Sequence, residues 1–479
     1  MKGAPPADLA RAGAAPISRS RSRARSGRRA ALVPAAATVG VVGGGAFLWR
    51  TLTWQSALSP DAWAYTAWGQ AVARGERPLF ELAATTPKPL GTFLGALVVP
   101  LPPGRGFAVV VALALGALGA FLFAAAYREG GAVAAAVAVV ALAAGAQLDV
   151  AVAFAFVDAV VAALIVAGIA FRGRLRIAAL VLAGLLRPEA WALAAFAGLT
   201  ETVGSWRRRG AGALAAGAAA PILWFLSDLV LTGDPLGTLH WRSERHAEEG
   251  LGTKPWSDVP GGFWDALAHE GGAVLAITGF LGLVVHFARG RRTGPVDPLP
   301  LAVAVGWSLT LALETRFGTE LNARYLLPVV AVLALGCGLL VAAFVPSRFR
   351  MGSPWPPAAV AAGALVVAVA FMGLEIGVPR EMARNEALVT SRPLVESVLR
   401  CGMLGVSGGR RARVVIPKLA ASSRRPLHDF GLYPGDGPYA GVLHSTLGGR
   451  VRNPTLPPWP PRSTGLGPLA VAPQCPVSG

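Results

Sequence analysis

One acidic residue, Asp61, lies in the segment 59–65 (SPDAWAY), directly after the first long apolar stretch of the chain. A carboxylate there could accept a proton from a reacting group, or it could simply cap the N-terminus of a helix. Trp63 and the aromatic residues close to it favour an amphipathic helix at 61–73, lying at the level of the lipid headgroups. Both interpretations of Asp61 stay open at this point.

Further ionisable residues gather at the ends of apolar stretches. Charged side chains are costly near hydrocarbon, so those found there tend to be functional. Arg187 and Glu189 flank Pro188 between two short apolar stretches, which predicts a broken helix pair that lines a cavity. This pair could be structural, or the Arg187 guanidinium could hold a lipid phosphate. The other positions are Arg74, Glu76 and Glu81; Lys88; Asp149 and Asp158; and the segment from Glu314 to Arg324.

The composition predicts a membrane protein and excludes a soluble one. Of the 479 residues, 54% are hydrophobic and 15% are charged, and the mean hydropathy is +0.53. Repeated apolar runs approach the ~20 residues that cross a bilayer as a helix. We predict an all-α polytopic fold with about eleven transmembrane helices, at roughly 31–49, 107–126, 132–148, 157–171, 176–187, 190–203, 211–231, 272–288, 299–315, 325–345 and 357–376.

Clusters of arginine indicate the orientation, because Lys and Arg in short loops stay on the cytoplasmic side of the plasma membrane. With the N-terminus inside, this number of spans also places four later arginine clusters inside, near 172–176, 207–209, 289–292 and 348–350. This odd number of spans is kept only if segment 88–101 does not cross the membrane. That segment must therefore lie at the outer interface or re-enter the membrane. The loop 50–106, with Asp61 and Lys88, then faces outward and becomes the predicted catalytic loop.

Three regions follow from this organisation. We expect a disordered Arg-rich cytoplasmic tail at 1–30, a membrane domain at 31–376 and an extracytoplasmic region at 377–479. In the last region we predict a helix at 380–400 and a buried strand at 413–417, which together indicate a small α/β unit.

Two of the three cysteines, Cys401 and Cys475, fall in this outer region, where thiols meet an oxidising compartment. We predict a disulfide between them, with two free thiols as the alternative. The third, Cys337, lies within a predicted helix.

The net charge of +18 would suggest nucleic acid as a partner of a soluble protein. Here many basic residues lie in the tail and in loops predicted to be inside, so we expect anionic lipid headgroups and no nucleic acid. His240 and His246 lie among glutamates in the loop 232–270, but they are six residues apart and would not share a helix face. We therefore favour an acceptor-binding or capping loop over a metal cluster. The sequence has no phosphate-binding loop motif, which argues against a mechanism driven by ATP.

Short motifs occur in a specific order: PDAWAY at 60–65, TPKPL at 86–90, VDA at 157–159, LRPE at 186–189 and ARYLLP at 323–328. With this order and topology, residues 31–345 resemble the GT-C-fold membrane glycosyltransferases. Within that class they look most like family 39, the protein O-mannosyltransferases and the aminoarabinose-transferase-like enzymes of bacteria, in an actinobacterial version.

The resemblance implies a hexosyl- or pentosyltransferase. Such an enzyme moves a sugar, with inversion, from a polyprenyl-phosphate donor to a cell-envelope glycan, lipid or protein at the outer face. By position, Asp61 would be the general base or the acid that orients the acceptor. The leaving phosphate would be neutralised by Lys88, Arg187 and Arg324. The sugar or acceptor would contact Asp158, Glu189, Tyr325 and Trp63.

Two departures from the family pattern bear on a cofactor. Many relatives carry two adjacent acids in the first loop and a Lys-Pro-Pro run, whereas here Asp61 follows Pro60 and Leu90 follows Pro89. No cofactor is therefore certain, and a divalent metal ion held by Asp61 and Asp158 stays an open alternative.

Two other functions would also need charges near a membrane. A transporter or flippase for a lipid-linked sugar would more often carry internal repeats and midplane charges, whereas here the charges gather at the outer ends of the predicted helices. A non-catalytic scaffold, whose outer region binds a partner, is the third hypothesis.

Overall fold

The computed structural model describes most of the chain up to residue 345 and short segments beyond it. The described residues are 32–49, 51, 58–80, 86–102, 105–145, 148, 151, 154–249, 253–293, 296–317, 321–345, 403–407, 416–417, 419–420, 430–433, 439–444, 461–464 and 467–471. The predicted tail at 1–30 and the predicted helices at 357–376 and 380–400 lie outside these residues.

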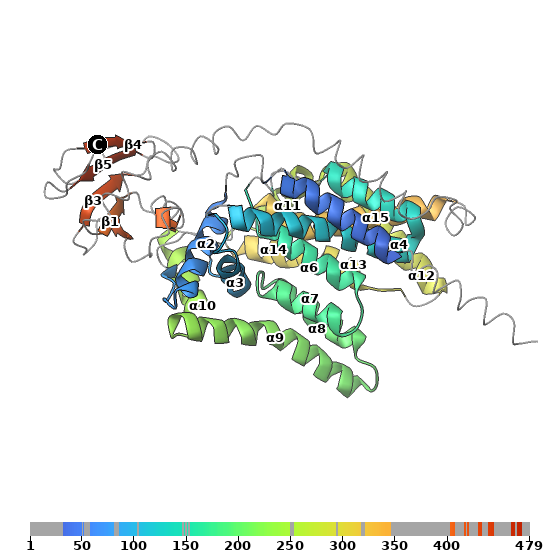
Figure 1. The fold of residues 1–479 in the computed structure, drawn as a ribbon. Helices are drawn as coiled ribbons and strands as arrows, with labels where there is room; N and C mark the ends of the chain where they lie inside the picture. Colours follow the sequence, from blue (N-terminus) through green and yellow to red (C-terminus); the bar gives the residue numbers. More distant parts are fainter. Residues whose placement is uncertain are drawn as a thin grey trace, which may run out of the picture.

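The described part up to residue 345 is helical, and its main helices run side by side (Figure 1). Every helix predicted between 31 and 345 is present. In chain order they are Leu32–Trp49, α2 (Pro60–Ala73), α3 (Pro89–Leu97), α4 (Arg105–Gly145), α6 (Asp158–Ala170), α7 (Arg174–Gly184), α8 (Ala190–Glu201), α9 (Trp206–Thr232), α10 (Gly237–Glu249), α11 (Asp258–Gly271), α12 (Ala273–Thr293), α13 (Leu299–Ala302), the π-helix η2 (Val303–Trp307), α14 (Ser308–Arg316), the 3₁₀-helix η3 (Ala323–Leu326) and α15 (Leu327–Phe344).

Four of the described helices are long and apolar enough to cross a membrane, or five if the bent pair Asp258–Ala268 and Ala273–Arg289 forms one span. The protein is therefore a membrane protein, but the predicted number of about eleven spans is not established. Helix α6, for example, has 13 residues. At 1.5 Å per residue it covers only ~20 Å of a hydrocarbon core that is ~30 Å thick.

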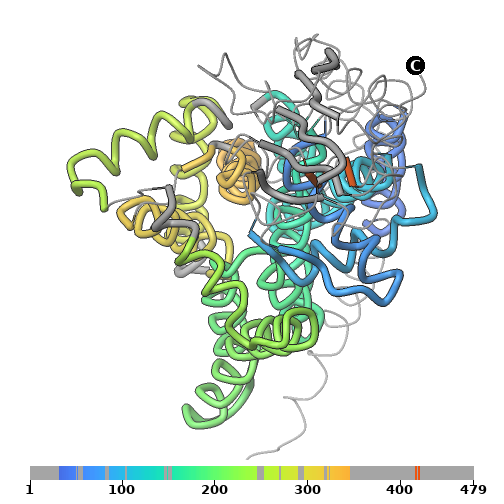
Figure 2. The backbone as a smooth tube through the Cα atoms, turned by 90° about the vertical axis from the view of Figure 1, so that its left-hand side faces the viewer, coloured from blue at the N-terminus to red at the C-terminus, as the bar shows by residue number. Residues whose placement is uncertain are grey.

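Close helix packing depends on small residues. Gly131 (φ 81°, ψ −167°) interrupts α4, which confirms the two helices predicted at 107–126 and 132–148. The first half of α4 packs on Leu32–Trp49, because a Cβ at Gly116 would come within 2.6 Å of the Gly40 carbonyl oxygen. The second half of α4 packs on α15, because a Cβ at Gly338 would come within 2.2 Å of the Ala134 carbonyl oxygen. The first helix (blue) and α9 (green) lie on opposite sides of this assembly (Figure 2).

Helix α2 was predicted to be amphipathic, and this is wrong: residues 62–71 are all buried inside the protein. Its position at the level of the headgroups stays a prediction. Tyr65 and Trp68 are both fully buried. A Cβ at Gly95 of α3 would lie 1.9 Å from the carbonyl oxygen of Tyr65, so the two helix backbones touch. The aromatic residues fill the space between these helices and α4, where the Tyr65 ring stacks on Phe107 with the centroids 5.7 Å apart.

The described C-terminal segments form a five-stranded sheet of order β2-β1-β3-β5-β4. Strand β1 pairs in parallel with β2 and β3, whereas β5 pairs antiparallel with β3 and β4. The sheet lies beyond the end of the helical assembly that carries α2 (Figure 1). Its strands are β1 (Met403–Ser407), β2 (Phe430–Tyr433), β3 (Tyr439–His444), β4 (Pro461–Thr464) and β5 (Gly467–Val471).

The strand predicted at 413–417 is wrong at its described residues, because Ile416 and Pro417 are helical. Proline cannot donate to a strand ladder, which disfavours a strand at Pro417. Ile416 is instead fully buried within the core of the helical part.

Candidate active site

Asp61 lies in the first turn of α2, and Ser59 caps that helix. The Ser59 hydroxyl accepts a hydrogen bond of 3.2 Å from the backbone N–H of Ala62, and Pro60 occupies the first turn. The expectation that Asp61 is the N-cap is therefore wrong. Pro60 has a fixed φ suited to the first helical position, which shifts the cap one residue before it. The backbone N–H of Ser59 also donates to the carbonyl of Phe154 at 2.7 Å, which ties α2 to the turn before α6.

Arg324 joins Asp61 to Asp158. Its Nη2 lies 2.8 Å from Asp61 Oδ2, and its Nε lies 3.6 Å from Asp158 Oδ2. The guanidinium carbon lies 4.6 Å from the centroid of the Phe156 ring, so an aromatic face also supports this cation. One arginine thus touches two carboxylates that come from different helices.

Arg187 holds the other side of Asp158. Its Nε and Nη2 donate to Asp158 Oδ1 at 3.1 and 2.5 Å. Its Nη1 lies 3.7 Å from Glu189 Oε1, and its guanidinium stacks 3.8 Å from the centroid of the Tyr325 ring. The stronger partner of Arg187 is therefore Asp158 and not Glu189, the neighbour considered from sequence.

These contacts form a buried chain of alternating charge, which we call the charge chain. Its members, in order of contact, are Asp61, Arg324, Asp158, Arg187 and Glu189. The side chains of Asp158 and Glu189 are 2% and 1% exposed. Buried charges persist only when they are paired, and the alternation provides a partner for each of them.

Lys88 lies beside the charge chain, at the N-terminus of α3. The backbone N–H of Leu90 donates to the carbonyl of Leu185 at 3.4 Å, which links this segment to the turn that carries Arg187. The Tyr65 hydroxyl donates to the carbonyl of Thr86 at 3.3 Å on the other side. Lys88 itself is 7% exposed. Burial lowers its pKa to about 8, with a further lowering by Arg187 that Asp158 and Asp61 partly oppose.

Several polar atoms of the charge chain have no hydrogen-bond partner among the described residues. They are Asp158 Oδ2, Glu189 Oε2 and Arg324 Nε. Of these, Asp158 Oδ2 and Arg324 Nε face each other as an ion pair at 3.6 Å, which is too long for a hydrogen bond. Buried polar groups are nearly always hydrogen-bonded, so unpaired ones mark a place where a polar ligand or water can bind. The site thus offers Glu189 Oε2 to a hydroxyl group, and its cations to an anion that competes with the carboxylates.

Most residues predicted for the site are brought together here, although they come from distant parts of the sequence. Trp63 is buried on α2, two residues after Asp61, and its Nε1 has no hydrogen-bond partner in the described structure. Arg74 and Glu76 instead pair with each other at 2.8 Å on the surface. Asp149 and Glu81 lie outside the described residues, as do Cys401 and Cys475, so the predicted disulfide is not tested.

The turn between Asp149 and Asp158 was predicted from the sequence, but the strained backbone at its end, before α6, was not. Ala155 has φ 49°, a left-handed conformation that is uncommon for a residue with a side chain, and the turn places Phe156 under Arg324. Such strain is often found at functional sites. No sequence signal marked it, because alanine and phenylalanine are ordinary residues of an apolar stretch.

A metal ion shared by Asp61 and Asp158 does not fit this arrangement, because Arg324 lies between the two carboxylates and neutralises both. Across the described ranges, no group of three or more His, Cys, Asp or Glu residues could hold a metal ion. In the segment 232–270, His240 contacts Asp234 at 2.7 Å, and both side chains are exposed.

Comparisons with solved structures return ArnT of Cupriavidus metallidurans and the oligosaccharyltransferase of Archaeoglobus fulgidus. The structural neighbours are GT-C membrane glycosyltransferases. ArnT bound to undecaprenyl phosphate is 15% identical with a TM-score of 0.49, and the match covers 93% of this chain and 98% of ArnT. The apo oligosaccharyltransferase is 14% identical with a TM-score of 0.46, covering 85% of this chain and 64% of its own. It has also been solved with Zn and sulfate.

No family model and no curated protein matches the sequence. At TM-scores below 0.5 the structural likeness decides neither the family nor the reaction. The function has to be argued from the residues of the site itself.

Proposed function

We propose that the protein is a membrane glycosyltransferase that moves a sugar from a polyprenyl-phosphate donor to a cell-envelope acceptor. The observation that carries this proposal is the charge chain together with the buried Lys88 beside it. The proposal places the site at the outer membrane face, with the N-terminus in the cytoplasm and the C-terminus outside. The class of donor comes from the resemblance of the sequence motifs.

The phosphate end of the donor fits the three cations. A phosphodiester carries one negative charge, and the phosphate that leaves carries two, so negative charge develops during the reaction. Lys88, Arg187 and Arg324 supply positive charge in a region shielded from water, where electrostatic stabilisation is strongest. Lys88 carries out this role only when it is protonated, which its pKa of about 8 allows at neutral pH.

Asp61 is the residue we assign as general base. The acceptor hydroxyl or amine gives its proton to the Asp61 carboxylate while its oxygen or nitrogen forms a bond to the anomeric carbon. The bond between that carbon and the phosphate oxygen breaks, and polyprenyl phosphate leaves with the electron pair. The products are the glycosylated acceptor, the free polyprenyl phosphate and a proton on Asp61.

The ion pair between Asp61 and Arg324 gives the reaction an order of events. In the absence of ligand, the Arg324 guanidinium occupies Asp61 Oδ2 at 2.8 Å, where an acceptor would have to bind. A donor phosphate that binds to Arg324 competes with this ion pair. Donor binding would thus release the Asp61 carboxylate for the acceptor, so the acceptor is activated only when the donor is present.

The sugar itself would meet Asp158 and Glu189, whose oxygens Oδ2 and Oε2 accept no hydrogen bond among the described residues and can accept one from a hydroxyl group. The aromatic faces of Tyr325 and Trp63 are the remaining candidates for contacts with the sugar or the acceptor. Pentose and hexose are both compatible with these contacts.

The test measures release of free polyprenyl phosphate by the protein in lipid nanodiscs. The assay supplies a panel of polyprenyl-phosphate sugars and a cell-envelope extract as the source of acceptor. Wild type is compared with Asp61→Asn and with the control Asp228→Asn. Asp228 is another buried carboxylate; it lies on α9 and accepts hydrogen bonds from Thr238 on α10. We expect sugar-dependent release by wild type and by Asp228→Asn, and a loss of at least ~100-fold in Asp61→Asn.

Two results would contradict the proposal. The first is the absence of release from every donor by a folded wild-type protein, and the second is full activity of Asp61→Asn. Transfer of an intact labelled donor between the leaflets of proteoliposomes, without cleavage, would instead identify a transporter.

A further inference from the structure

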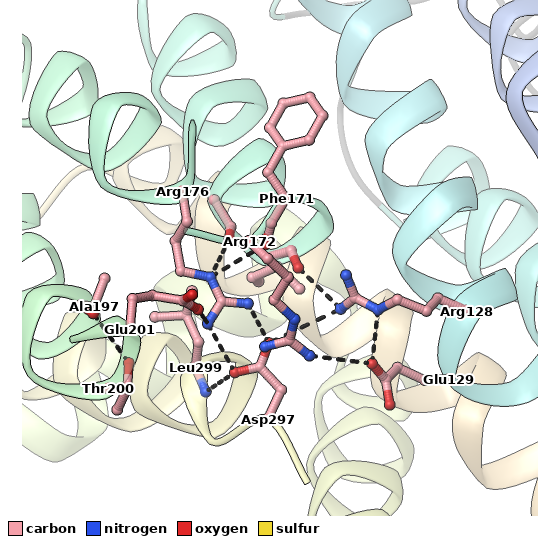
Figure 3. A network of polar contacts seen from close by, with 12 residues as sticks. Arg128, Glu129, Phe171, Arg172, Arg176, Ala197, Thr200, Glu201, Asp297 and Leu299 are labelled. Carbon is pink, nitrogen blue, oxygen red and sulfur yellow. Dashed lines mark hydrogen bonds and ion pairs between the residues drawn. The ribbon is translucent and has the colours of Figure 1, made fainter. Parts of the chain in front are cut away.

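A second group of buried charges lies at the opposite end of α6 and α7 from the charge chain, and we call it the inner clamp (Figure 3). At its centre, Asp297 Oδ2 lies 2.5 Å from both Arg172 Nη1 and Arg176 Nη2. Arg128 reaches the same oxygen at 3.9 Å, and Arg176 Nη1 also contacts Glu201 at 2.7 Å. Arg176 and Asp297 have side chains only 1% and 2% exposed.

The inner clamp binds the backbone of the turn between α6 and α7. Arg128 donates to the carbonyls of Ala170 and Ile169 at 2.7 and 3.0 Å, and Arg176 Nε donates to that of Gly168 at 2.9 Å. The last carbonyls of a helix have no partner within it, so these bonds satisfy the C-terminal end of α6. On the other side of the turn, the backbone N–H of Gly173 donates to Glu201 at 2.7 Å.

Helices α6 and α7 connect this turn directly to the reacting residues. Asp158 is the first residue of α6, and Arg187 follows the last residue of α7 by three positions. The two helices are closely packed, because a Cβ at Gly168 would meet the Leu180 side chain at 2.9 Å. A shift of the turn along the helix axes would therefore move Asp158 and Arg187 relative to Arg324, which comes from a different element.

We propose that Asp297 is a positioning residue for the reaction, acting through the hairpin of α6 and α7 on Asp158 and Arg187. It touches neither of them, and it comes from the segment before α13. Asp297 holds two arginines of the hairpin on one carboxylate. It thereby fixes the position of the hairpin along its helix axes relative to Arg324. The role in catalysis rests on the proposed function, whereas the mechanical coupling does not.

The size of the expected effect follows from how sharply transfer depends on geometry. A misplacement of ~1 Å, caused by a change far from the chemistry, can cost ~100-fold in rate. The partners of Asp297 are charged and buried, so Asp297→Asn leaves Arg176 with Glu201 as its remaining carboxylate partner among the described residues.

The experiment measures backbone hydrogen exchange and transfer activity of the full chain in nanodiscs. The variants are Asp297→Asn and Asp297→Glu, with Asp228→Asn as a control, because Asp228 is another carboxylate removed from solvent and lies outside the hairpin. For Asp297→Asn we expect faster exchange at 185–190 and at least tenfold lower kcat/KM, with partial recovery in Asp297→Glu. The control should change neither. If Asp297→Asn does not fold, Arg172→Gln replaces it, because Arg172 is 48% exposed.

Faster exchange confined to residues 169–176, with unchanged exchange at 185–190, would overturn the proposal and leave the inner clamp with local stability alone. Unchanged kcat/KM in a folded Asp297→Asn would overturn it as well. If no donor supports transfer by wild type, the proposed function fails, and the exchange measurement still decides whether Asp297 is coupled to the outer end of the hairpin.

Discussion

Arg324 and Asp61 are 263 residues apart in the sequence, and the arginine Nη2 lies 2.8 Å from the carboxylate Oδ2. The same guanidinium reaches Asp158, so a single side chain joins α2, α6 and η3, the short helix that leads into α15. The pair links the residue that we assign as base to a cation that we assign to the donor phosphate. Whether Asp61 can accept a proton therefore depends on what else Arg324 binds.

The geometry of Arg324, and not only its charge, is expected to matter. Arg324→Lys keeps the positive charge but replaces a planar fork with a single ammonium, which cannot reach both carboxylates in the same way. We expect kcat/KM for the donor to fall ~10- to 100-fold in Arg324→Lys and further in Arg324→Gln. Steady-state release of polyprenyl phosphate measures this. Equal activities of wild type and Arg324→Lys would show that charge alone is sufficient.

The pH dependence of donor use should reflect Lys88. Because burial lowers the pKa of Lys88 to about 8, its cationic form is present below that pH and is lost above it. We expect kcat/KM for the donor to fall with rising pH through about 8, since this ratio reports groups of the free enzyme.

Lys88→Arg supplies the control for this pH profile, because a guanidinium stays charged throughout the range. The decline near pH 8 should disappear in that variant, while Lys88→Met should be slow at every pH. A decline that persists unchanged in an active Lys88→Arg protein would assign it to another group.

Stability should depend strongly on Asp158. Asp158→Asn leaves the buried Arg187 without its closest anionic partner. Breaking a buried pair by removing one partner costs about 3–5 kcal/mol. Thermal unfolding in detergent should show a clearly lower midpoint. Glu76→Gln is the matched control, because it breaks the exposed pair with Arg74, which is worth about 0–1 kcal/mol. Equal midpoints for the two variants would show that the Arg187 pair adds no stability.

The contact between α2 and α3 should not tolerate a methyl group. A Cβ at Gly95 would lie 1.9 Å from the backbone oxygen of Tyr65, and backbone cannot rotate away as a side chain could. We expect Gly95→Ala to lower stability by about 1–3 kcal/mol and to reduce transfer, because Asp61 and Lys88 lie on the two helices that it separates. Gly45→Ala, where nothing lies within 4 Å, is the control and should be neutral or slightly stabilising.

The predicted disulfide between Cys401 and Cys475 is tested by mass spectrometry. If the two are linked, alkylation without reductant modifies neither, and reduction before alkylation adds two labels per chain. Cys337 is half-buried on α15 beside Thr278, its Sγ 3.1 Å from Thr278 Oγ1, and serves as an internal reference. Labelling of Cys401 and Cys475 without reductant would show free thiols.

The sequence alone determined the helices predicted between 31 and 345 and which residues could do chemistry, but it did not predict α10 and α11, which form in the segment 232–270 interpreted as a loop. Apolar runs of helical length need no tertiary context, because a backbone in lipid must satisfy its own hydrogen bonds. Isolated charges such as Asp61, Lys88 and Arg187 were recognisable for the same reason, since each is costly among apolar residues.

Only the tertiary structure decided how these residues pair. Arg187 was adjacent in sequence to Glu189, yet its closest carboxylate is that of Asp158, 29 residues away. Asp297 was not recognised at all, because a single aspartate in a proline-containing loop looks like any solvated loop residue. Pairing depends on which helix ends meet in space, and that is set by packing of small residues such as Gly95 and Gly168 and not by local sequence.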